Sequence, residues 1–482
     1  MKYELEVCQI VYDVFKTQIQ FGAYRAGNSL PTLEQSADYY LVSLDTIRSA
    51  YLKLQQEGYV KMSTNVGAMV IKDYDAKEIE QHVQQFFSLR KRALIDLSKS
   101  LGPLFRYAQW IGLKNIPAET YSKIQLLKTN QELPPLVAFK HVMAAYTSLG
   151  NHLLLRLLWQ TFMFFGAPFF SVPENPWCVF AVTEYAPQTL DLCLKKDWES
   201  LRTSVNDALD SLDRTLNQFY EDRITALSTQ PEISFTWSSY KKASQIRYSL
   251  AMDLLISISR GQYPANTLLP SQDKLAREKG VSVSTIRRAL VLLNGIGATQ
   301  SLPRVGIKVL PFHETASHCD FTKPEIRRRL MDMAQSLQIV ALSCKAVSEI
   351  TIASLDADKI QKCIERLSHV KNRHRYELIT FVVMELSVQS SPYQAIRTIY
   401  GELLRQLFWG YALRSIWKEN HDEVSFYLSS LDTLIHSLEK AEIERFSGTF
   451  EAFIVHEFHF VIRILSQLGI QEAENLLIPD IQ

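Results

Sequence analysis

The chain has 482 residues, 47% of them hydrophobic and 21% charged, and its formal net charge is +1. This is the composition of a globular protein with room for about three or four domains, and any basic surface must be local. The six cysteines are scattered without a C-x-x-C pair, which disfavours a disulfide framework or a cysteine zinc site. The sequence has no apolar leader and no run of about 18 apolar residues, so we expect a cytoplasmic protein without a membrane span.

One stretch of the sequence occurs twice, at residues 22–70 and 261–309. The two copies align without a gap, and 17 of their 49 positions are identical. A repeat of this length is typical of two copies of one structural unit. Because the copies are separated by about half the chain, the sequence predicts a duplicated fold, with one copy in each half.

Each copy has the pattern of two helices, a turn and a β-ribbon. In the first copy, Thr32 and Gln35 form a capping-box pattern that predicts a short helix. After a tight turn, Ser43 is placed to cap a second helix, whose apolar residues recur at helical spacing. Gly58 ends this helix, and two short strands then surround a Thr-Asn-Val-Gly tip. The second copy repeats the order, although Lys274 breaks its capping box. This arrangement predicts a winged helix-turn-helix in each copy.

Spaced motifs recur in both copies. The first carries G-x-Y-x-x-G-x-x-L-P-T and V-S-x-x-T-I-R-x-A, and the second keeps L-P-S, V-S-x-S-T-I-R-R-A-L and V-G-x-x-V. These motifs resemble the DNA-binding domain of the GntR family of bacterial transcription regulators. The resemblance implies that the second helix of each copy reads DNA. Two arginines that are usual in the family are replaced in both copies, by Leu44 and Val283 after the V-S pair and by Glu34 and Asp273 after the L-P pair.

The resemblance and the side-chain chemistry together suggest which residues contact DNA. Arginine offers a bidentate fork to guanine, serine and threonine more often bind phosphate, and an arginine on a wing can enter a minor groove. An aspartate at a helix start can accept a hydrogen bond from cytosine. The alternative roles are helix caps for the serines and surface positions for the arginines. The candidate residues are Ser43, Asp45, Thr46, Arg48, Ser282, Ser284, Thr285, Arg287, Arg288 and Arg304.

Helical patterns fill most of the remaining sequence. Residues 139–162 resemble the helical ligand-binding domain of the FadR-like GntR subfamily. In metal-binding members of that subfamily a histidine follows the first phenylalanine of this stretch, whereas this chain has Lys140 here and Val382 at the matching place in its second half. His456 and His459 have helical metal-ligand spacing, but no matching ligands are evident. We therefore expect no metal and no cofactor.

Residues 166–187 are rich in proline and aromatic residues. This composition predicts an ordered loop with little helix over the first bundle. The aromatic side chains in and before this stretch, from Trp159 to Phe170, are expected to form core more often than a ligand site.

We therefore predict a mainly α protein. Two winged helix-turn-helix domains, each with a small β-wing, are expected to alternate with two α-helical bundle domains. The predicted parts are the first winged unit (residues 1–75), the first helical region (76–228), a linker (229–240), the second winged unit (241–312) and the second helical region (320–482).

The expected function is that of a sequence-specific transcription regulator. It is expected to bind a double-stranded DNA operator and to respond to a small-molecule effector in its helical regions. Ordinary twofold regulators need two chains to place two recognition helices one DNA turn apart. This chain carries both, so it can act as a monomeric pseudo-dimer or as a homodimer. The alternative is an interaction protein or co-regulator with degenerate winged units that no longer bind DNA, which the replaced arginines favour. The sequence has no recognisable catalytic motif, so an enzyme is not expected.

Overall fold

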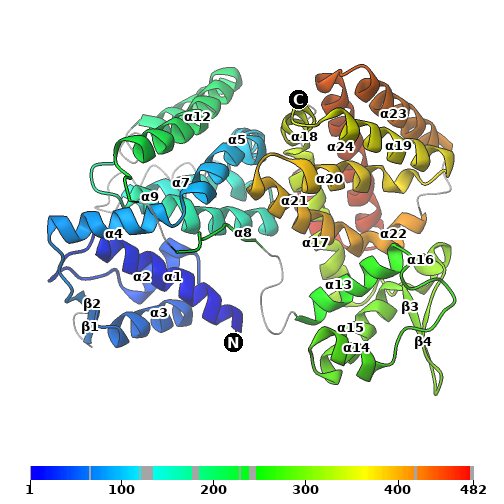
Figure 1. The fold of residues 1–482 in the computed structure, drawn as a ribbon, viewed down its shortest axis with the longest axis horizontal. Coiled ribbons are helices and arrows are strands. Elements are labelled where there is room, and N and C mark those ends of the chain that lie inside the picture. The colour runs from blue at the N-terminus through cyan, green and yellow to red at the C-terminus, as the bar shows by residue number, and fades with distance from the viewer. Residues whose placement is uncertain are drawn as a thin grey trace. The chain divides into compact units, whose positions relative to one another are not determined.

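The computed structural model describes residues 2–63, 67–117, 119–120, 134–175, 184–226, 230–237, 246–416 and 421–477. Contacts divide the chain into two units, Met1–Leu149 with Leu155–Thr236, and Gly150–Leu154 with Trp237–Gln482. Each unit contains one winged unit and most of one helical region, and each is described by itself (Figure 1). Part of the predicted linker lies outside the described residues, and Cys178 lies outside them as well.

The first winged unit has the elements that its sequence predicts. They are α1 (Lys2–Gln20), α2 (Leu33–Tyr40), α3 (Leu44–Gln56), β1 (Val60–Ser63) and β2 (Gly67–Val70). Both hydrogen bonds of the capping box are present, from the backbone N–H of Gln35 to Thr32 Oγ1 at 3.1 Å and from the backbone N–H of Thr32 to Gln35 Oε1 at 2.9 Å. The strands pair antiparallel, with Val60 opposite Val70 and Ser63 opposite Gly67.

The second winged unit repeats this structure residue by residue. Its elements are α13 (Ile246–Ser259), α14 (Gln272–Lys279), α15 (Val283–Ile296), β3 (Thr299–Leu302) and β4 (Gly306–Val309). Helix α14, the start of α15 and both strands lie 239 residues after their counterparts in the first unit. Even an isolated β-bridge is repeated at this offset, Ser29 with Met69 and Leu268 with Lys308. The structure therefore confirms that the sequence repeat is a repeat of a fold.

Apolar and aromatic packing fixes the helices of each winged unit. In the first unit, Ile47 and Leu54 of α3 are fully buried. The ring of Phe15 on α1 makes edge contacts with Tyr40 and Tyr51, each at a centroid distance of 5.2 Å. Edge-to-face contacts of this kind add to the stabilisation from burial. One face of the recognition helix is thereby held against the core, and the opposite face is left to solvent.

The first helical region is a bundle in which α5 and α12 pack along each other (Figure 1). The described part of residues 166–187 differs from the predicted loop, because it is largely helical. A π-helical turn, Phe162–Gly166, leads directly into α9, and α11 begins at Ala186. The helices are α4 (Ala76–Ser88), α5 (Lys91–Lys114), α7 (Pro134–Thr147), α8 (His152–Thr161), α9 (Ala167–Phe170), α11 (Ala186–Lys195) and α12 (Trp198–Asp222).

The second helical region is built around α24, which packs against α17, α18 and α23. The inner face of α24 buries Phe446, Phe450, Phe453 and Phe458, so aromatic side chains form the centre of the bundle. The helices are α16 (Thr315–His318), α17 (Pro324–Ala341), α18 (Cys344–Ala353), α19 (Ala357–Asn372), α20 (Ile379–Ser390), α21 (Gln394–Leu407), α22 (Tyr411–Ile416), α23 (His421–Glu439) and α24 (Ile443–Gln467). The chain is thus mainly α, with a small β-wing in each half.

Two helical stretches among the described residues reach the length and hydropathy of a membrane span. His152–Phe170 does so by itself, although 72% of this window is buried inside the protein. Pro324–Ala341 and Cys344–Ala353 do so only if they are taken together, and they meet at an angle of 60°. A core helix has the same composition as a span, so these stretches are weak indications of membrane insertion.

Candidate nucleic-acid interface and ligand cavity

The first recognition helix, α3, begins with a serine cap and an ion pair. Ser43 Oγ accepts from the backbone N–H of Thr46 at 3.2 Å, and the two side-chain hydroxyls lie 2.8 Å apart. Thr46 is only 6% exposed, so its hydroxyl belongs to the cap. Asp45 and Arg48 are exposed, and Arg48 Nη1 lies 2.8 Å from Asp45 Oδ1. The structure therefore brings the two charged candidates of this helix together in one ion pair.

The second recognition helix, α15, has the same cap with a different charge pattern. Ser282 Oγ accepts from the backbone N–H of Thr285 at 3.2 Å and lies 2.9 Å from the hydroxyl of Ser284. Arg287 and Arg288 are exposed, and Arg287 Nε donates to the neutral side chain of Gln272 at 3.4 Å. Within the described part of the chain, neither arginine has an ion-pair partner. The positive charge of both guanidinium groups is therefore available to an anionic binding partner.

The helix-turn-helix segments of the two units differ in charge. Helices α2 and α3 together carry three acidic and two basic side chains, whereas α14 and α15 carry two acidic and five basic ones. Phosphate attracts basic surfaces without regard to sequence. The second unit therefore has the more favourable surface for DNA.

The wing of the second unit adds one more cation. Arg304 lies at the tip between β3 and β4, is exposed, and has a positive φ of 62°. Its counterpart in the first unit, Asn65, lies outside the described residues. The structure thus places Arg287, Arg288 and Arg304 on the second winged unit with their side chains exposed.

Lys140 has a structural partner in the first winged unit. Its Nζ lies 3.5 Å from Asp38 Oδ2 and 4.3 Å from the centre of the Tyr39 ring. Nearby, Trp159 Nε1 donates to the backbone oxygen of Tyr40 at 2.6 Å. These contacts fasten the end of α2 to helices α7 and α8. Lys140 therefore joins the first winged unit to its helical bundle.

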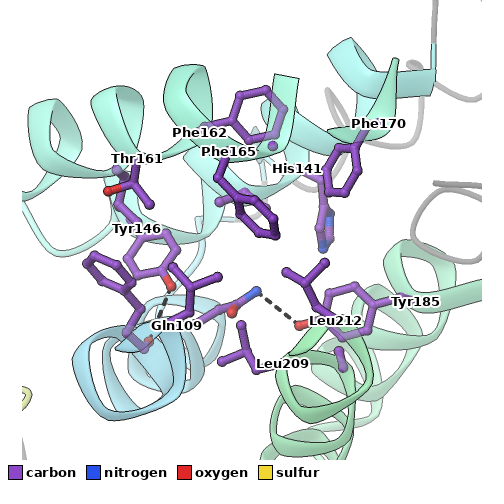
Figure 2. A pocket seen from close by; sticks show the side chains of 16 residues that line it. Gln109, His141, Tyr146, Thr161, Phe162, Phe165, Phe170, Tyr185, Leu209 and Leu212 are labelled. Atoms are coloured by element: carbon purple, nitrogen blue, oxygen red, sulfur yellow. Dashed lines mark hydrogen bonds between the residues drawn. The ribbon is translucent and has the colours of Figure 1, made fainter. Parts of the chain in front are cut away.

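A cavity of about 100 Å³ lies inside the first helical region. Figure 2 shows Phe162, Phe165 and Phe170 at one side of it and Leu209 and Leu212 at the other. No Asp, Glu, Lys or Arg is among its described lining residues. A space with such walls suits an uncharged and largely apolar molecule.

Within the part of the chain that the structure describes, two polar atoms in this cavity wall have no hydrogen-bond partner, His141 Nδ1 and Thr161 Oγ1. His141 is only 2% exposed, and burial lowers its pKa to about 4, so the ring is neutral at physiological pH. Its Nε2 lies 3.2 Å from Thr189 Oγ1, which in turn donates to backbone oxygens of its own helix. The single proton of that hydroxyl is therefore used, so His141 Nε2 carries the donated hydrogen. His141 Nδ1 is left as a buried acceptor.

The other polar groups of the cavity are paired. Gln109 Nε2 donates to Tyr185 Oη at 3.0 Å, and Tyr146 Oη donates to the backbone oxygen of Phe105 at 3.2 Å (Figure 2). A buried acceptor without a donor costs about 1–3 kcal/mol. His141 Nδ1 and Thr161 Oγ1 are therefore the two atoms at which a bound molecule gains most.

Sequence reasoning missed this cavity. Its aromatic wall was expected to be core, and His141 gave no signal because no ligand spacing surrounds it. The histidine pair that did have metal-ligand spacing is used otherwise: the His456 ring packs on Phe426 at 4.1 Å, and Glu457 between the pair accepts a hydrogen bond from Thr380. Among the described residues, no group of three or more His, Cys, Asp or Glu side chains could hold a metal ion.

Comparisons with known proteins match the winged units. The family model described as "Bacterial regulatory proteins, gntR family" matches residues 9–70 and again residues 248–309. The uncharacterized HTH-type transcriptional regulator YieP of Escherichia coli K12 is 35% identical over 66 residues. This match covers 14% of the present chain and 29% of YieP.

Solved structures of regulators also align with part of the chain, 44–49% of it in the structures compared. The GntR protein of Streptococcus agalactiae is 16% identical, with 44% of this chain and 99% of that chain covered and a TM-score of 0.21. A putative GntR transcriptional regulator from Rhodococcus sp. RHA1 is 14% identical, with 45% and 98% covered and a TM-score of 0.27. Since these scores are low, the family assignment rests on the two matched segments and on their motifs. Two segments of the chain, one in each half, thus match the GntR family model, and each folds as a winged helix-turn-helix.

Proposed function

We propose that this protein is a cytoplasmic transcription regulator that binds double-stranded DNA mainly through its second winged unit. The observation that carries the proposal is the pair of exposed arginines, Arg287 and Arg288, one turn into α15 and without ion-pair partners in the described structure. The N-terminal part of the second helix of a helix-turn-helix is the part that meets base edges. Arginine at this place can bind guanine through a bidentate fork.

Selection from a random DNA pool with the full-length chain tests this proposal. We expect an enriched motif whose affinity falls steeply with salt, because phosphate contacts release counterions. The double substitution of Arg287 and Arg288 to glutamine should abolish the enrichment, whereas Arg48→Gln should weaken it less. A selection that enriches nothing, or binding that does not depend on salt, would show that the chain is not a DNA reader.

We further propose that a small effector binds in the cavity of the first helical region. The same helices that line this cavity also hold the first winged unit. Helix α7 carries His141 in the cavity wall beside Lys140, and the stretch that carries Thr161 also carries Trp159. A molecule that shifts these helices therefore changes contacts made directly to α2.

The cavity chemistry narrows the class of effector. An apolar cavity of about 150 Å³ can hold benzene, and the present cavity of about 100 Å³ is partly open, so it suits a molecule of about one ring. His141 Nδ1 accepts but cannot donate, and a charged group would meet no opposite charge in the described wall. The effector class is thus a small uncharged molecule with one hydroxyl or N–H donor.

Phenol and benzene are suitable probes, because they differ by the hydroxyl alone. Phenol should raise the thermal midpoint of the full chain in a concentration-dependent manner, as any ligand specific for the folded state does. Benzene should do so less, and Thr161→Val and His141→Leu should reduce the difference between the probes. Equal effects of both probes on the unmodified protein would refute a polar role for the cavity wall.

The alternative function, assembly with another regulator, is favoured for the first winged unit by one observation. Asp45 neutralises Arg48 within the recognition helix itself. If selection yields DNA that only the second unit contacts, the first unit serves a role other than operator binding.

A further inference from the structure

Arg414 is a buried cation with unused hydrogen-bond donors. It lies on α22, is 5% exposed, and neither its Nε nor its Nη2 has a hydrogen-bond partner among the described residues. Three aromatic rings, those of Phe381, Tyr411 and Phe408, lie 4.4, 5.4 and 5.5 Å from its guanidinium carbon. Stacking on rings holds a guanidinium plane in place, but it does not satisfy the N–H groups at its edge.

Nearby carboxyl groups do not fully balance the charge of Arg414. Glu377 is buried and pairs with Arg375. Glu457 on α24 accepts from Thr380 Oγ1, and burial raises its pKa to about 8, so it is largely protonated at neutral pH. Two guanidinium groups, those of Arg375 and Arg414, therefore share the carboxyl group of Glu377. An unpaired buried charge is strongly unfavourable, which makes an anion the natural complement of this site.

A cavity of about 170 Å³ lies against both guanidinium groups. The second helical region contributes Arg375, Tyr411 and Arg414 to its wall, and the second winged unit contributes residues 258–265 and 309–312 in part. The winged-unit wall includes apolar side chains such as Phe312, which also contacts the Tyr411 ring at 5.0 Å. The space thus combines a cationic end with an apolar side.

We propose that this cavity, between α22 and the second winged unit, binds a small organic anion whose carboxylate or phosphate group receives the free N–H groups of Arg414 and is paired with Arg375. Guanidinium groups bind both kinds of oxyanion through parallel hydrogen bonds. Because the wall comes from a DNA-reading domain and from its bundle, the bound anion joins the two. The site is separate from the effector cavity of the first half, and its occupancy can be measured without DNA.

Thermal unfolding of the full-length chain at constant ionic strength tests the site. The probes are benzoate, its neutral analogue benzamide, and inorganic phosphate. Benzoate, phosphate or both should raise the midpoint with a saturable dose dependence, and benzamide should not. The arm that saturates at lower concentration identifies the preferred oxyanion. No shift with either anion, or an equal shift with benzamide, would overturn the proposal.

Substitutions locate the binding. Arg375→Gln, at a partly exposed position, and Arg414→Lys, which keeps the charge but loses the planar fork, should each raise the apparent Kd at least tenfold. If Arg414→Lys fails to fold, Arg375→Gln decides alone. The control is Arg373→Gln. Arg373 lines a neighbouring cavity of about 320 Å³, whose wall also includes Arg414. Arg373 itself is not among the described lining residues of the proposed site. The control substitution should change the apparent Kd less than twofold. Loss of binding in this control, or unchanged binding in Arg375→Gln, would refute the location.

Discussion

Arg48 Nη1 lies 2.8 Å from Asp45 Oδ1 on the exposed side of α3, one turn into the first recognition helix. An arginine engaged in this way must exchange its carboxylate for phosphate or a base before it can bind DNA. At the matching position of α15 the aspartate is replaced by Ser284, which contacts the cap hydroxyl of Ser282. The two recognition helices therefore differ in how much free positive charge they offer.

The first prediction follows from this pair. Asp45→Ser should release Arg48, raise the affinity of the full-length chain for duplex DNA at low salt, and steepen the dependence of log K on log salt by about one unit. If Asp45 reads a cytosine, selection should also show a relaxed base preference in one half-site only, worth about 1–3 kcal/mol. Fluorescence anisotropy with the selected operator measures both effects.

The reverse substitution is the matched control. Ser284→Asp places the same carboxylate near Arg287 and Arg288, and should weaken binding and flatten the salt dependence. If both substitutions leave the affinity unchanged, the exposed faces of α3 and α15 are not the DNA contacts.

The second prediction concerns the arginine that only the second unit has. Arg288→Ser gives α15 the residue that α3 carries at Ser49. Loss of one phosphate or base contact should lower the affinity and reduce the salt slope by about one unit if the contact is to phosphate. Ser49→Arg, which adds a cation to α3, should act in the opposite direction. An effect of Ser49→Arg alone would assign DNA reading to the first unit instead.

The third prediction uses the turn before each recognition helix. Leu41 has φ 52° and Gly280, its counterpart, has φ 63°. A left-handed backbone costs a non-glycine residue about 1–2 kcal/mol, and Leu41 is 57% exposed, so it gains little from burial. Leu41→Gly should therefore raise the free energy of unfolding of the first half by about 0.5–1 kcal/mol, measured by urea titration.

The exchange can be made in the second unit as its control. A Cβ added at Gly280 meets no atom within 4 Å, so Gly280→Ala introduces backbone strain without a clash. It should lower the stability by about 1 kcal/mol. A stabilising effect of Gly280→Ala would contradict the strain argument for both turns.

The fourth prediction is a pH dependence. Burial lowers the pKa of His141 to about 4, below its ordinary value of 6.5. Between these values the unfolded chain binds a proton that the folded chain does not. This contribution to stability is therefore complete above pH 6.5 and is lost as the pH falls towards 4, by at most about 1.4 kcal/mol per pH unit. His141→Gln should remove this part of the acid dependence in thermal unfolding between pH 4.5 and 7. Parallel curves for both proteins would show that His141 titrates normally.

The winged units could be predicted almost to the residue, because local signals agree there. Thr32 and Gln35 form the expected capping box, and Ser43 and Ser282 cap the helices that they precede. Caps, turns and periodic apolar residues act over a few positions and are visible in a sequence. The orientation of the Thr46 side chain could not be predicted in this way, because it depends on the contact of its hydroxyl with the Ser43 hydroxyl.

The cavities could not be predicted, because they depend on packing between distant segments. The π-helical turn at Phe162–Gly166 and helix α9 follow a composition that indicates a loop. Their aromatic residues are helical because the bundle buries them, and tertiary burial overrides local propensity. Likewise, His141 Nδ1 and the Nε and Nη2 of Arg414 lack partners among the described residues only because of the way in which each bundle packs around them.

The repeat also has a consequence for gene dosage. In a regulator made of separate subunits, a defective copy of the gene yields mixed assemblies that disable intact subunits. Here α3 and α15 belong to one polypeptide, so the two recognition helices are made in equal number. Dilution cannot separate them, and a mutated helix remains on the chain that encodes it. A cell with one intact and one damaged allele should therefore keep a full set of intact helix pairs from the intact allele.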